Sequence, residues 1–437
     1  MFELKSFFIR TYGCQMNELD SELMIGILEK RGLKKAKSED SADILIFNTC
    51  AVRDLSERKI LGKLGLISRK KKKHKLIGIT GCMPMNKKNL LTKFPYVDFI
   101  LGTNNLMNLD EAIDEAWNRK MRICKAEDKH EDIDASLINR QNPLQAYISI
   151  IRGCNKYCSY CVVPFTRGRE ISKKIAYVLE EAKMAIDKGA KEIILLGQNV
   201  NSYGKDCKDG VDFPDLLAKL NNLVGLERIR FLTSHPVDIT LKLMEAMRDL
   251  NKVCEYVHFP LQAGSNNILQ KMRRAYTVEE YFEKVTLFRK IVPSVKIGTD
   301  IIVGFPSETE EDFQKTISCF EKVKFSQAFI FAYSARPGTL AQKTYKDDIP
   351  TEVKNQRVNI LLTIFHQILT EEMNKEIGSI KEILVEATGR ENNTFKGKTR
   401  GFEKVIFSAD NALIGSMNNI KISDVKHETY IGEKLLS

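Results

Sequence analysis

Short apolar runs alternate with amphipathic stretches along the first hundred residues. Runs with strand character occupy residues 5–11, 43–50, 75–82 and 97–102, and the stretch 17–30 has the spacing of a helix that Gly32 ends. A second, charged helix is expected from Arg53 towards Lys70. Continuous apolar strands separated by helices indicate a parallel sheet covered on both faces. We therefore expect an open parallel α/β domain over residues 1–122.

The same alternation returns after residues 123–142, a polar and non-periodic stretch that we interpret as a linker. Strands are expected at 147–151, 192–197, 228–233, 257–261, 297–303 and 327–333, with helices between them, for example at 277–290 and 308–322. Six such βα units predict a partial (β/α)6 barrel over residues 143–372. In barrels of this kind the chemistry gathers at the carboxyl ends of the strands.

The last segment changes character from about Gly378 onwards. Residues 381–386 and 404–407 alternate as strands do, which predicts a small all-β barrel over residues 373–437. Four basic residues surround Phe395 in this segment: Arg390, Lys396, Lys398 and Arg400. Basic side chains around an aromatic ring suit a nucleic-acid surface. A plain exposed hairpin explains the same pattern, and this segment alone does not decide between them.

Three cysteines with the spacing C-x3-C-x2-C begin the predicted barrel: Cys154, Cys158 and Cys161. A tight loop of this kind can place three thiolates around an iron–sulfur cluster, which normally takes four. No fourth cysteine follows within the loop. A zinc site or an electron-transfer ferredoxin would require further ligands that the loop lacks. We therefore expect a cluster with one open iron, able to bind a substrate or cofactor.

Three more cysteines each lie just past the end of an expected strand in the first domain: Cys14, Cys50 and Cys82. Ligands of open parallel sheets collect at this edge. The placement predicts a second metal site with three thiolate ligands, although three unrelated small residues would give the same pattern. The remaining cysteines, Cys124, Cys207, Cys254 and Cys319, have no ligand spacing and are interpreted as ordinary thiols.

Charge and cysteine usage narrow the setting in which the chain works. The 437 residues include 68 basic and 57 acidic side chains, a net charge of +11, which favours a polyanionic partner such as RNA. Ten cysteines without a signal peptide indicate the reducing cytoplasm. No apolar run reaches the roughly 18 residues of a membrane helix. The basic block 69–75 is interpreted as a solvated helix end.

Several loops at the ends of the barrel strands carry candidate side chains for cofactor binding. Gly197 could admit a nucleotide closely, Gln262 lies in another such loop, and Arg336 could pair with a carboxylate or phosphate. Plain turns and a surface arginine explain them as well. His235 and His258 are interpreted as structural residues, since one lies in a turn and the other inside a strand.

Five sequence motifs resemble those of the radical S-adenosylmethionine (SAM) methylthiotransferases, most closely the MiaB type. They are Thr11-Tyr12-Gly13-Cys14-Gln15-Met16-Asn17, Asn48-Thr49-Cys50-Ala51-Val52-Arg53, Arg152-Gly153-Cys154-Asn155-Lys156-Tyr157-Cys158, Thr166-Arg167-Gly168-Arg169-Glu170 and Asp300-Ile301-Ile302-Val303-Gly304-Phe305-Pro306. The resemblance spans nearly the whole chain. It implies a methylthiotransferase domain, a radical SAM core and a TRAM module that binds RNA.

The resemblance also implies cofactors and a reaction. Cys154, Cys158 and Cys161 would hold a 4Fe-4S cluster that binds SAM and cleaves it to a 5′-deoxyadenosyl radical. Cys14, Cys50 and Cys82 would hold an auxiliary 4Fe-4S cluster that presents sulfur. The expected product is 2-methylthio-isopentenyladenosine beside the anticodon, with a second SAM supplying the methyl group.

Expected partners are the tRNA anticodon stem-loop, SAM and an electron donor such as flavodoxin or ferredoxin, with the chain acting as a monomer. A sister enzyme acting on threonylcarbamoyladenosine in tRNA, or on an aspartate of a ribosomal protein, is an alternative. A non-catalytic iron–sulfur protein that binds RNA and senses redox state is a second alternative.

Overall fold

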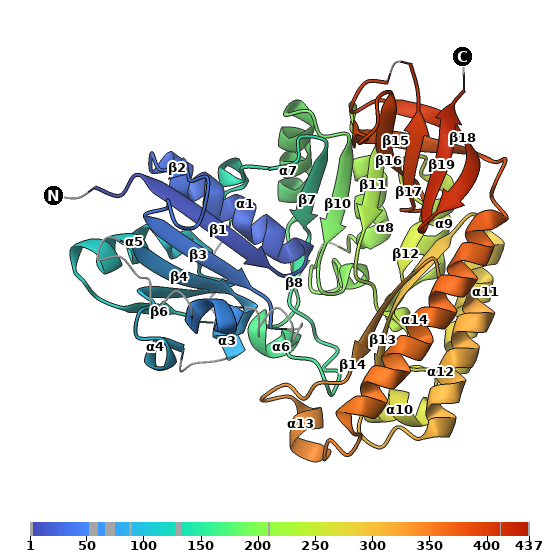
Figure 1. Ribbon diagram of the computed structural model, residues 1–437, viewed down its shortest axis with the longest axis horizontal. Coiled ribbons are helices and arrows are strands. Elements are labelled where there is room, and N and C mark those ends of the chain that lie inside the picture. Colours follow the sequence, from blue (N-terminus) through green and yellow to red (C-terminus); the bar gives the residue numbers. More distant parts are fainter. Residues whose placement is uncertain are drawn as a thin grey trace. The chain divides into compact units, whose positions relative to one another are not determined.

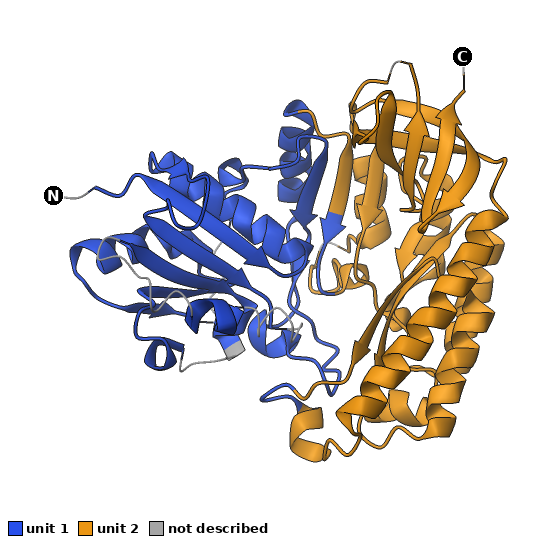
Figure 2. Ribbon diagram, in the orientation of Figure 1, with its two compact units in different colours: residues 1–188, 195–198, 336–339 blue, residues 189–194, 199–335, 340–437 orange. Residues whose placement is uncertain are grey.

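The computed structural model describes residues 3–51, 60–65, 75–86, 90–127, 133–208, 210–410 and 412–435. The chain divides into two compact units (Figure 2). Unit 1 comprises residues 1–188, 195–198 and 336–339, and unit 2 comprises residues 189–194, 199–335 and 340–437. The division falls inside the predicted barrel, so the six cysteines of interest all belong to unit 1.

A six-stranded sheet forms the first part of unit 1, in the order β2-β1-β3-β4-β5-β6. Every neighbouring pair is parallel, which confirms the open α/β domain. The strands are β1 (Ser6–Tyr12), β2 (Lys34–Lys35), β3 (Ile44–Thr49), β4 (Leu76–Gly81), β5 (Phe99–Gly102) and β6 (Ile123–Lys125). Every residue of β3, β4 and β5 is buried, as continuous apolar strands require. Residues 123–125, which we assigned to the linker, are instead the edge strand β6.

Helices cover this sheet and lead out of its strands (Figure 1). The helix α1 (Gln15–Lys30) contacts β1, β3 and α5 (Leu109–Asn118). Shorter helices are α3 (Cys82–Asn86), α4 (Leu90–Lys93) and the 3-10 turn η1 (Leu106–Asn108). Of the charged helix expected from residue 53 to 70, the described residues 60–65 are helical and the others lie outside the described part. The basic block 69–75 is described only at Lys75.

The rest of unit 1 continues from the linker into the cysteine loop. Its elements are η2 (Ala135–Leu137), β7 (Gln145–Ser149), β8 (Ile151–Arg152), α6 (Val163–Thr166), β9 (Ile171–Ser172) and α7 (Ile175–Asp187). The strands β8 and β9 pair in antiparallel fashion on either side of the loop. Residues 195 and 196, which end β10, also belong to unit 1, where the Ile150 amide donates to the Leu196 carbonyl at 2.9 Å.

Unit 2 contains most of the remaining βα elements. The strands β12 (Tyr256–His258), β13 (Lys296–Val303) and β14 (Gln327–Ala332) form a parallel sheet. The start of β10 (Glu192–Leu196) lies beside β11 (Arg228–Phe231). The helices are η3 (Val200–Ser202), α8 (Phe213–Asn221), η4 (Pro236–Asp238), α9 (Leu241–Asp249), α10 (Asn266–Lys271), α11 (Val278–Ile291), α12 (Glu310–Val323), α13 (Leu340–Thr344) and α14 (Thr351–Asn374).

A closed five-stranded barrel ends unit 2, which confirms the predicted all-β module. Its strands follow the order β15-β16-β17-β19-β18. They are β15 (Ile380–Thr388), β16 (Thr394–Thr399), β17 (Lys404–Ser408), β18 (Met417–Lys426) and β19 (Thr429–Lys434). None of the described helices combines the length and apolar character needed to cross a membrane.

Two buried arginines of β11 fasten this barrel to the rest of unit 2. Arg228 donates to the Lys398 and Glu382 carbonyl oxygens at 2.7 and 2.9 Å. Arg230 donates to the carbonyl oxygens of Arg400 and Thr399 at 2.7 and 2.6 Å, and its Nε pairs with Glu192 at 2.6 Å. Each guanidinium therefore satisfies backbone acceptors that a smaller side chain would leave unpaired.

Candidate active site

Cys14, Cys50 and Cys82 lie at one edge of the unit 1 sheet, as the sequence predicted. Each follows one of three adjacent strands, β1, β3 and β4. Cys14 is the N-cap residue of α1, and Cys82 begins α3. Gly81 makes the sharp exit from β4 possible, because its φ is +98° and a Cβ there would stand 2.4 Å from the Thr49 carbonyl oxygen.

A buried amide network holds the ends of these strands together. Asn17 Nδ2 donates to Asn48 Oδ1 at 3.0 Å, and Asn48 Nδ2 donates back to the Asn17 carbonyl at 2.7 Å. The Asn17 side chain also accepts from the Cys14 amide at 3.3 Å. Thr49 Oγ1 donates to the Thr80 carbonyl at 2.8 Å, which joins the next pair of strands. The backbone around all three thiols is thus cross-linked by buried polar groups, which rigidify a site when they are satisfied.

The second group of thiols lies on the loop between β8 and α6. Two residues of this loop adopt left-handed backbone, Gly153 at φ +77° and Tyr157 at φ +49°. The Cys154 amide donates to the Gly168 carbonyl at 3.2 Å. Asn155 and Glu170 exchange two hydrogen bonds of 3.2 Å each between backbone amide and side-chain oxygen. The Gly153 amide donates to Gln198 Oε1 at 2.7 Å. Hydrogen bonds therefore hold the start of the loop both to residues 168–170 and to Gln198.

Residues that follow the cysteine loop contact the end of the sheet where Cys50 and Cys82 lie, within unit 1. Val162, which directly follows Cys161, packs with Cys82 and Ala51 in one buried cluster. Arg167 Nε donates to Cys82 Sγ at 3.3 Å. Thr103, just past β5, donates to the Thr166 carbonyl at 3.0 Å. The turn after the cysteine loop therefore touches the sheet edge that carries Cys50 and Cys82.

Buried charges surround the junction between the two groups. Arg167 pairs with Asp20 at 2.9 Å, and Arg152 lies close enough to sense both charges. Burial would lower the pKa of Arg167, but Cys82, Asp20 and Cys14 raise it above its usual value. Glu181, the other carboxylate that Arg152 senses, is shared between Arg140 and Lys173. Arg152 and Arg167 are therefore two buried positive charges near Asp20, while Glu181 is already paired with other residues. Their excess positive charge favours a negatively charged ligand such as a thiolate.

Burial also controls the protonation of the thiols. Burial raises the pKa of the Cys82 thiol to about 12, although the charge of Arg167 opposes the shift. Burial likewise raises the pKa of Cys154 to about 11. Thiols with such pKa values keep their protons at neutral pH, so a cation has to displace those protons when it binds.

The donor chemistry distinguishes between kinds of metal centre. No disulfide joins any of the ten cysteines, all of which lie in the described part. Among the residues that the structure describes, no three Cys, His, Asp or Glu side chains stand close enough to share one ion. In an iron–sulfur cluster each thiolate binds its own iron, so its ligands do not converge on one point. Three cysteine thiols at each of the two places are the type of donor that iron–sulfur clusters take.

The three predicted contacts to the cofactor fall in different places. Gly197 and Arg336 belong to unit 1, and the Arg336 carbonyl accepts from Thr339. Gln262 belongs to unit 2, where its left-handed backbone at φ +73° allows its amide to donate to the Asp300 carbonyl at 2.9 Å. Their role in binding SAM stays a prediction.

The two histidines that we interpreted as structural residues, His235 and His258, both have partners within unit 2. His235 Nδ1 accepts from the Val237 amide at 3.3 Å and caps η4. His258 Nε2 lies 3.0 Å from Asp300 Oδ2, and its ring contacts Phe329.

Cys254 and Cys319 are buried, whereas Cys124 is exposed on β6 and Cys207 is half-buried. The interpretation of these four cysteines as ordinary thiols stays a prediction.

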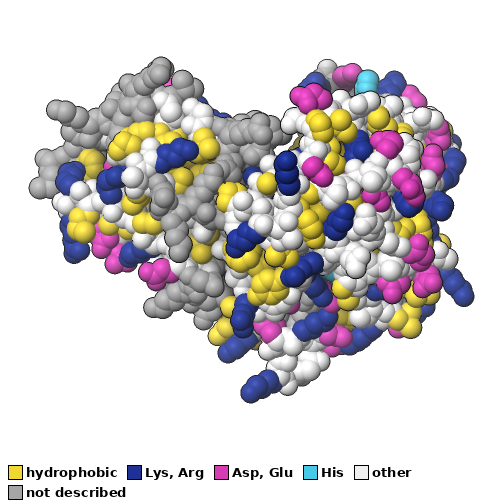
Figure 3. All heavy atoms as spheres, turned by 90° about the horizontal axis from the view of Figure 1, so that it is seen from below, with side chains coloured by type: hydrophobic (Ala, Val, Ile, Leu, Met, Phe, Trp, Pro, Cys, Tyr) yellow, Lys and Arg dark blue, Asp and Glu magenta, His cyan; other side chains and the backbone are white. Residues whose placement is uncertain are grey.

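Two of the four basic residues that the sequence places around Phe395 have partners within unit 2. Arg400 binds Glu255 through Nε and Nη2 at 2.7 and 2.8 Å and also donates to the Val253 carbonyl. Lys398 pairs with Glu386 at 3.2 Å and lies over the Phe402 ring. Arg400 thus anchors the barrel within unit 2. Figure 3 shows a different face, seen from below in the view of Figure 1, on which Lys and Arg side chains are interspersed with hydrophobic ones.

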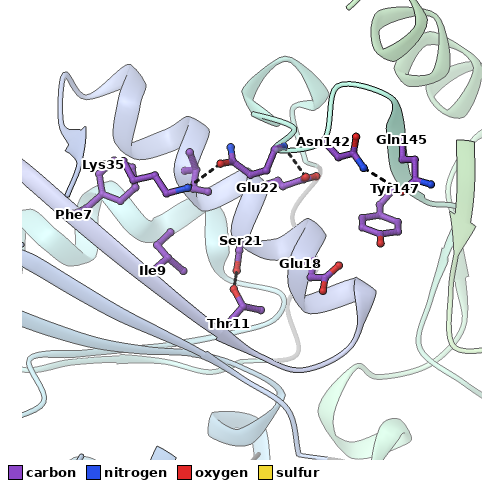
Figure 4. A pocket seen from close by; sticks show the side chains of 12 residues that line it. Phe7, Ile9, Thr11, Glu18, Ser21, Glu22, Lys35, Asn142, Gln145 and Tyr147 are labelled. Carbon is purple, nitrogen blue, oxygen red and sulfur yellow. Dashed lines mark hydrogen bonds between the residues drawn. The ribbon is translucent and has the colours of Figure 1, made fainter. Parts of the chain in front are cut away.

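A cavity of about 400 Å³ lies beside α1 (Figure 4). Glu18 and Glu22 line it from the helix, and Gln141 and Tyr147 line it from the linker and β7. Lys35 Nζ donates to Gln141 Oε1 at 2.9 Å beside it. None of the six cysteines lines this cavity, so it is separate from the thiol groups.

Sequence reasoning missed Asp20, Arg152 and Arg167 as site residues. Arg152 and Arg167 stand in the sequence motifs that we singled out, whereas Asp20 lies inside α1 with no motif around it. A carboxylate among the mostly apolar buried positions of α1 is the signal that could have pointed to Asp20.

Comparison with known proteins identifies the family. Residues 6–102 match the family described as "Uncharacterized protein family UPF0004", and residues 148–320 match the radical SAM superfamily. A protein of Protochlamydia amoebophila named tRNA-2-methylthio-N(6)-dimethylallyladenosine synthase is 50% identical, with 99% of this chain and 97% of that protein aligned. Proteins with the same name from Thermoanaerobacter sp. (97% of this chain, 92% of that protein) and Clostridium botulinum (98% and 97%) are 45% and 43% identical.

Two solved structures share the fold at low sequence identity. The radical S-adenosylmethionine methyltransferase TsrM of Kitasatospora setae has a TM-score of 0.57 at 14% identity, over 78% of this chain and 74% of that one. The cobalamin-dependent radical enzyme OxsB has a TM-score of 0.52 at 10% identity, over 84% and 56%. The sequence matches carry the assignment, and this chain belongs to the tRNA-2-methylthio-N(6)-dimethylallyladenosine synthase family of radical SAM enzymes.

Proposed function

We propose that this protein replaces the hydrogen on adenine C2 of isopentenyladenosine in tRNA with a methylthio group. Family membership supports this reaction, because relatives at 43–50% identity over almost the whole chain bear that name. The observation in the structure that supports the proposal is that Val162 and Arg167, which follow the cysteine loop, contact Cys82 within unit 1. One reaction that both activates a C–H bond and delivers sulfur needs its two reactive centres close together.

Cys154, Cys158 and Cys161 would hold the cluster that binds SAM, and Cys14, Cys50 and Cys82 would hold the second 4Fe-4S cluster. When bound, the first cluster and SAM supply the activation of the C–H bond, and the second cluster presents the sulfur that another SAM methylates. The left-handed backbone at Gly153 and Tyr157 shapes the loop around its three thiols. The Asn17–Asn48 network keeps the other three at a fixed sheet edge.

Gly197, Gln262 and Arg336 are the candidate contacts for SAM. Arg336 is buried, and a guanidinium is the side chain best suited to a carboxylate such as that of the methionyl group. The glycine allows close approach of a ligand to the backbone.

The substrate and the electron source follow from this assignment. The anticodon stem-loop of tRNA would be recognised with the help of the C-terminal barrel and the basic excess of +11. A small electron-transfer protein such as flavodoxin or ferredoxin would supply electrons to a monomeric enzyme. The reducing cytoplasm suits this chemistry, since cysteine thiols persist there without forming disulfides.

Nucleoside mass spectrometry of tRNA from a deletion strain tests the reaction. We expect isopentenyladenosine to accumulate and its 2-methylthio derivative to disappear. The wild-type gene should restore the product, a Cys82→Ala gene should not, and Cys319→Ser, at a buried cysteine of unit 2, should. Persistence of the 2-methylthio derivative in the deletion strain would refute the assignment.

A further inference from the structure

Arg167 has a buried hydrogen-bond donor that no described residue satisfies. Its Nε donates to Cys82 Sγ at 3.3 Å and its Nη2 to Asp20 Oδ2 at 2.9 Å. The Arg167 side chain is only 4% exposed, and its Nη1 is buried without a hydrogen-bond partner among the described residues. Leaving a charged donor unpaired in the interior costs free energy. The guanidinium therefore points to an acceptor that belongs beside Cys82.

Several elements fix the position of this guanidinium. Asp20 projects from the buried side of α1 and holds Nη2, with its own side chain only 2% exposed. The Arg167 amide donates to the Val163 carbonyl at 2.9 Å, which ends α6. The next carbonyl, of Gly168, accepts from the Cys154 amide. One turn thus places its backbone against the loop that begins at Cys154 and the Arg167 side chain against Cys82.

The missing acceptor has a recognisable chemistry. A guanidinium is permanently charged and presents its donors in a fixed planar fork. Two arms of that fork already bind a sulfur atom and a carboxylate. The Arg152 guanidinium also lies near, so a cationic or neutral donor group would be disfavoured there. An anionic sulfur next to Cys82 satisfies both the charge and the unpaired donor.

We propose that Arg167 is a positioning residue that donates to the sulfur atoms of the centre held by Cys14, Cys50 and Cys82. Nε binds the Cys82 thiolate, and Nη1 binds a second anionic sulfur of the same centre. This inference rests on the proposed function, since it presumes a cluster at these cysteines. Hydrogen bonds to the sulfurs and nearby charge set the reduction potential of iron–sulfur clusters. Arg167 accordingly raises the potential of this centre, and Asp20 lowers it.

A purely structural role for the Arg167–Asp20 ion pair is the competing explanation. The chain offers a matched control in Arg140, which pairs with Glu181 at 2.9 Å in the same unit and is similarly buried. Arg140→Lys alters a buried ion pair away from the sulfur atoms. Arg167→Lys keeps the positive charge beside Asp20 but cannot reach both sulfur positions with one ammonium group.

The test is an EPR-monitored redox titration of the full-length chain after anaerobic cluster assembly. The Cys154→Ala/Cys158→Ala/Cys161→Ala background isolates the second cluster, which should contribute roughly four iron atoms per chain. In this background we expect Arg167→Lys to shift the reduction potential downwards, Asp20→Asn to shift it upwards, and Arg140→Lys to leave it unchanged. An upward shift cannot arise from simple loss of folding.

Each outcome bears on a separate claim. If the cluster forms but neither Arg167→Lys nor Asp20→Asn moves its potential, the role of Arg167 is refuted and the proposed function stands. If the Arg167→Lys variant loses its iron, the reduction potential of the Asp20→Asn variant takes its place in the test. An upward shift supports the role of Arg167, and an unchanged potential refutes it. If the background variant binds no cluster at all, the two-cluster function fails and this inference fails with it.

Discussion

Asn155 and Glu170 hold each other across the cysteine loop. The Asn155 amide donates to Glu170 Oε1 and the Glu170 amide donates to Asn155 Oδ1, both at 3.2 Å. The pair lies between the strand that enters the loop and the strand that leaves it, β8 and β9. It therefore restrains the loop around its three thiols without occupying any of them.

Breaking this pair should weaken cluster binding. We expect Asn155→Ala or Glu170→Ala to speed iron loss to a chelator roughly tenfold, as changes in the groups that orient metal ligands commonly do. The double variant should be little worse than either single one, because the two bonds form one unit. Tyr157→Phe, at an exposed ring of the same loop, serves as the control. Additive effects would show that the pair does not act as a unit.

Gly153→Ala should abolish the loop conformation. Its φ is +77°, and an added Cβ would stand 2.0 Å from the Arg169 carbonyl oxygen, so the backbone has to move. We expect iron at this site to fall to background in an assembly assay. Gly210→Ala has a similar φ of +71° but open space around it, so it isolates the backbone strain of about 1 kcal/mol. Equal iron retention by both variants would contradict the account.

The anchor of the C-terminal barrel should contribute strongly to stability. Arg230 and Glu192 are each 1% exposed, and Arg230 also carries two carbonyl oxygens of the barrel. Arg230→Met should lower the free energy of unfolding by about 3–5 kcal/mol, because it leaves a buried carboxylate unpaired. Denaturant unfolding measures this loss. Arg248→Ala, at an exposed ion pair with Asp249, should change little.

The pH dependence of stability has a local source at Glu376. Burial opposes ionisation there, but Lys296, Tyr430 and Lys381 together lower the pKa of this carboxyl from 4.5 to about 2. A depressed folded-state pKa gives stability that is present above pH 4.5 and is lost as the pH falls towards 2. Glu376→Gln should therefore cost about 1–2 kcal/mol at pH 7 and progressively less below pH 4.5. A cost that does not change with pH would contradict this explanation.

Much of the fold could be predicted from the sequence because its signals are local. Continuous apolar runs located β3, β4 and β13, and the C-x3-C-x2-C spacing located the cysteine loop. The edge strand β6 was not predicted, because three residues beside a polar stretch carry no periodic signal. A pairing partner in the sheet, rather than intrinsic preference, makes such a segment a strand.

Contacts that join distant parts of the chain could not be predicted in this way. Arg167 meets Cys82 from 85 positions away, and Arg400 meets Glu255 from 145 positions away. The sequence showed Arg400 only as one of several basic residues near an aromatic ring. The fold decides which guanidinium is buried against an acceptor and which remains at the surface.

We propose that the cluster held by Cys154, Cys158 and Cys161 activates the substrate and that the cluster held by Cys14, Cys50 and Cys82 delivers the sulfur. The most direct test of this claim measures 5′-deoxyadenosine and methylthiolated tRNA in the same anaerobic reaction with SAM, reductant and isopentenylated tRNA. We predict that the Cys14→Ala/Cys50→Ala/Cys82→Ala variant forms 5′-deoxyadenosine without methylthiolated tRNA, and that the Cys154→Ala/Cys158→Ala/Cys161→Ala variant forms neither. Methylthiolated tRNA from either variant would contradict the claim.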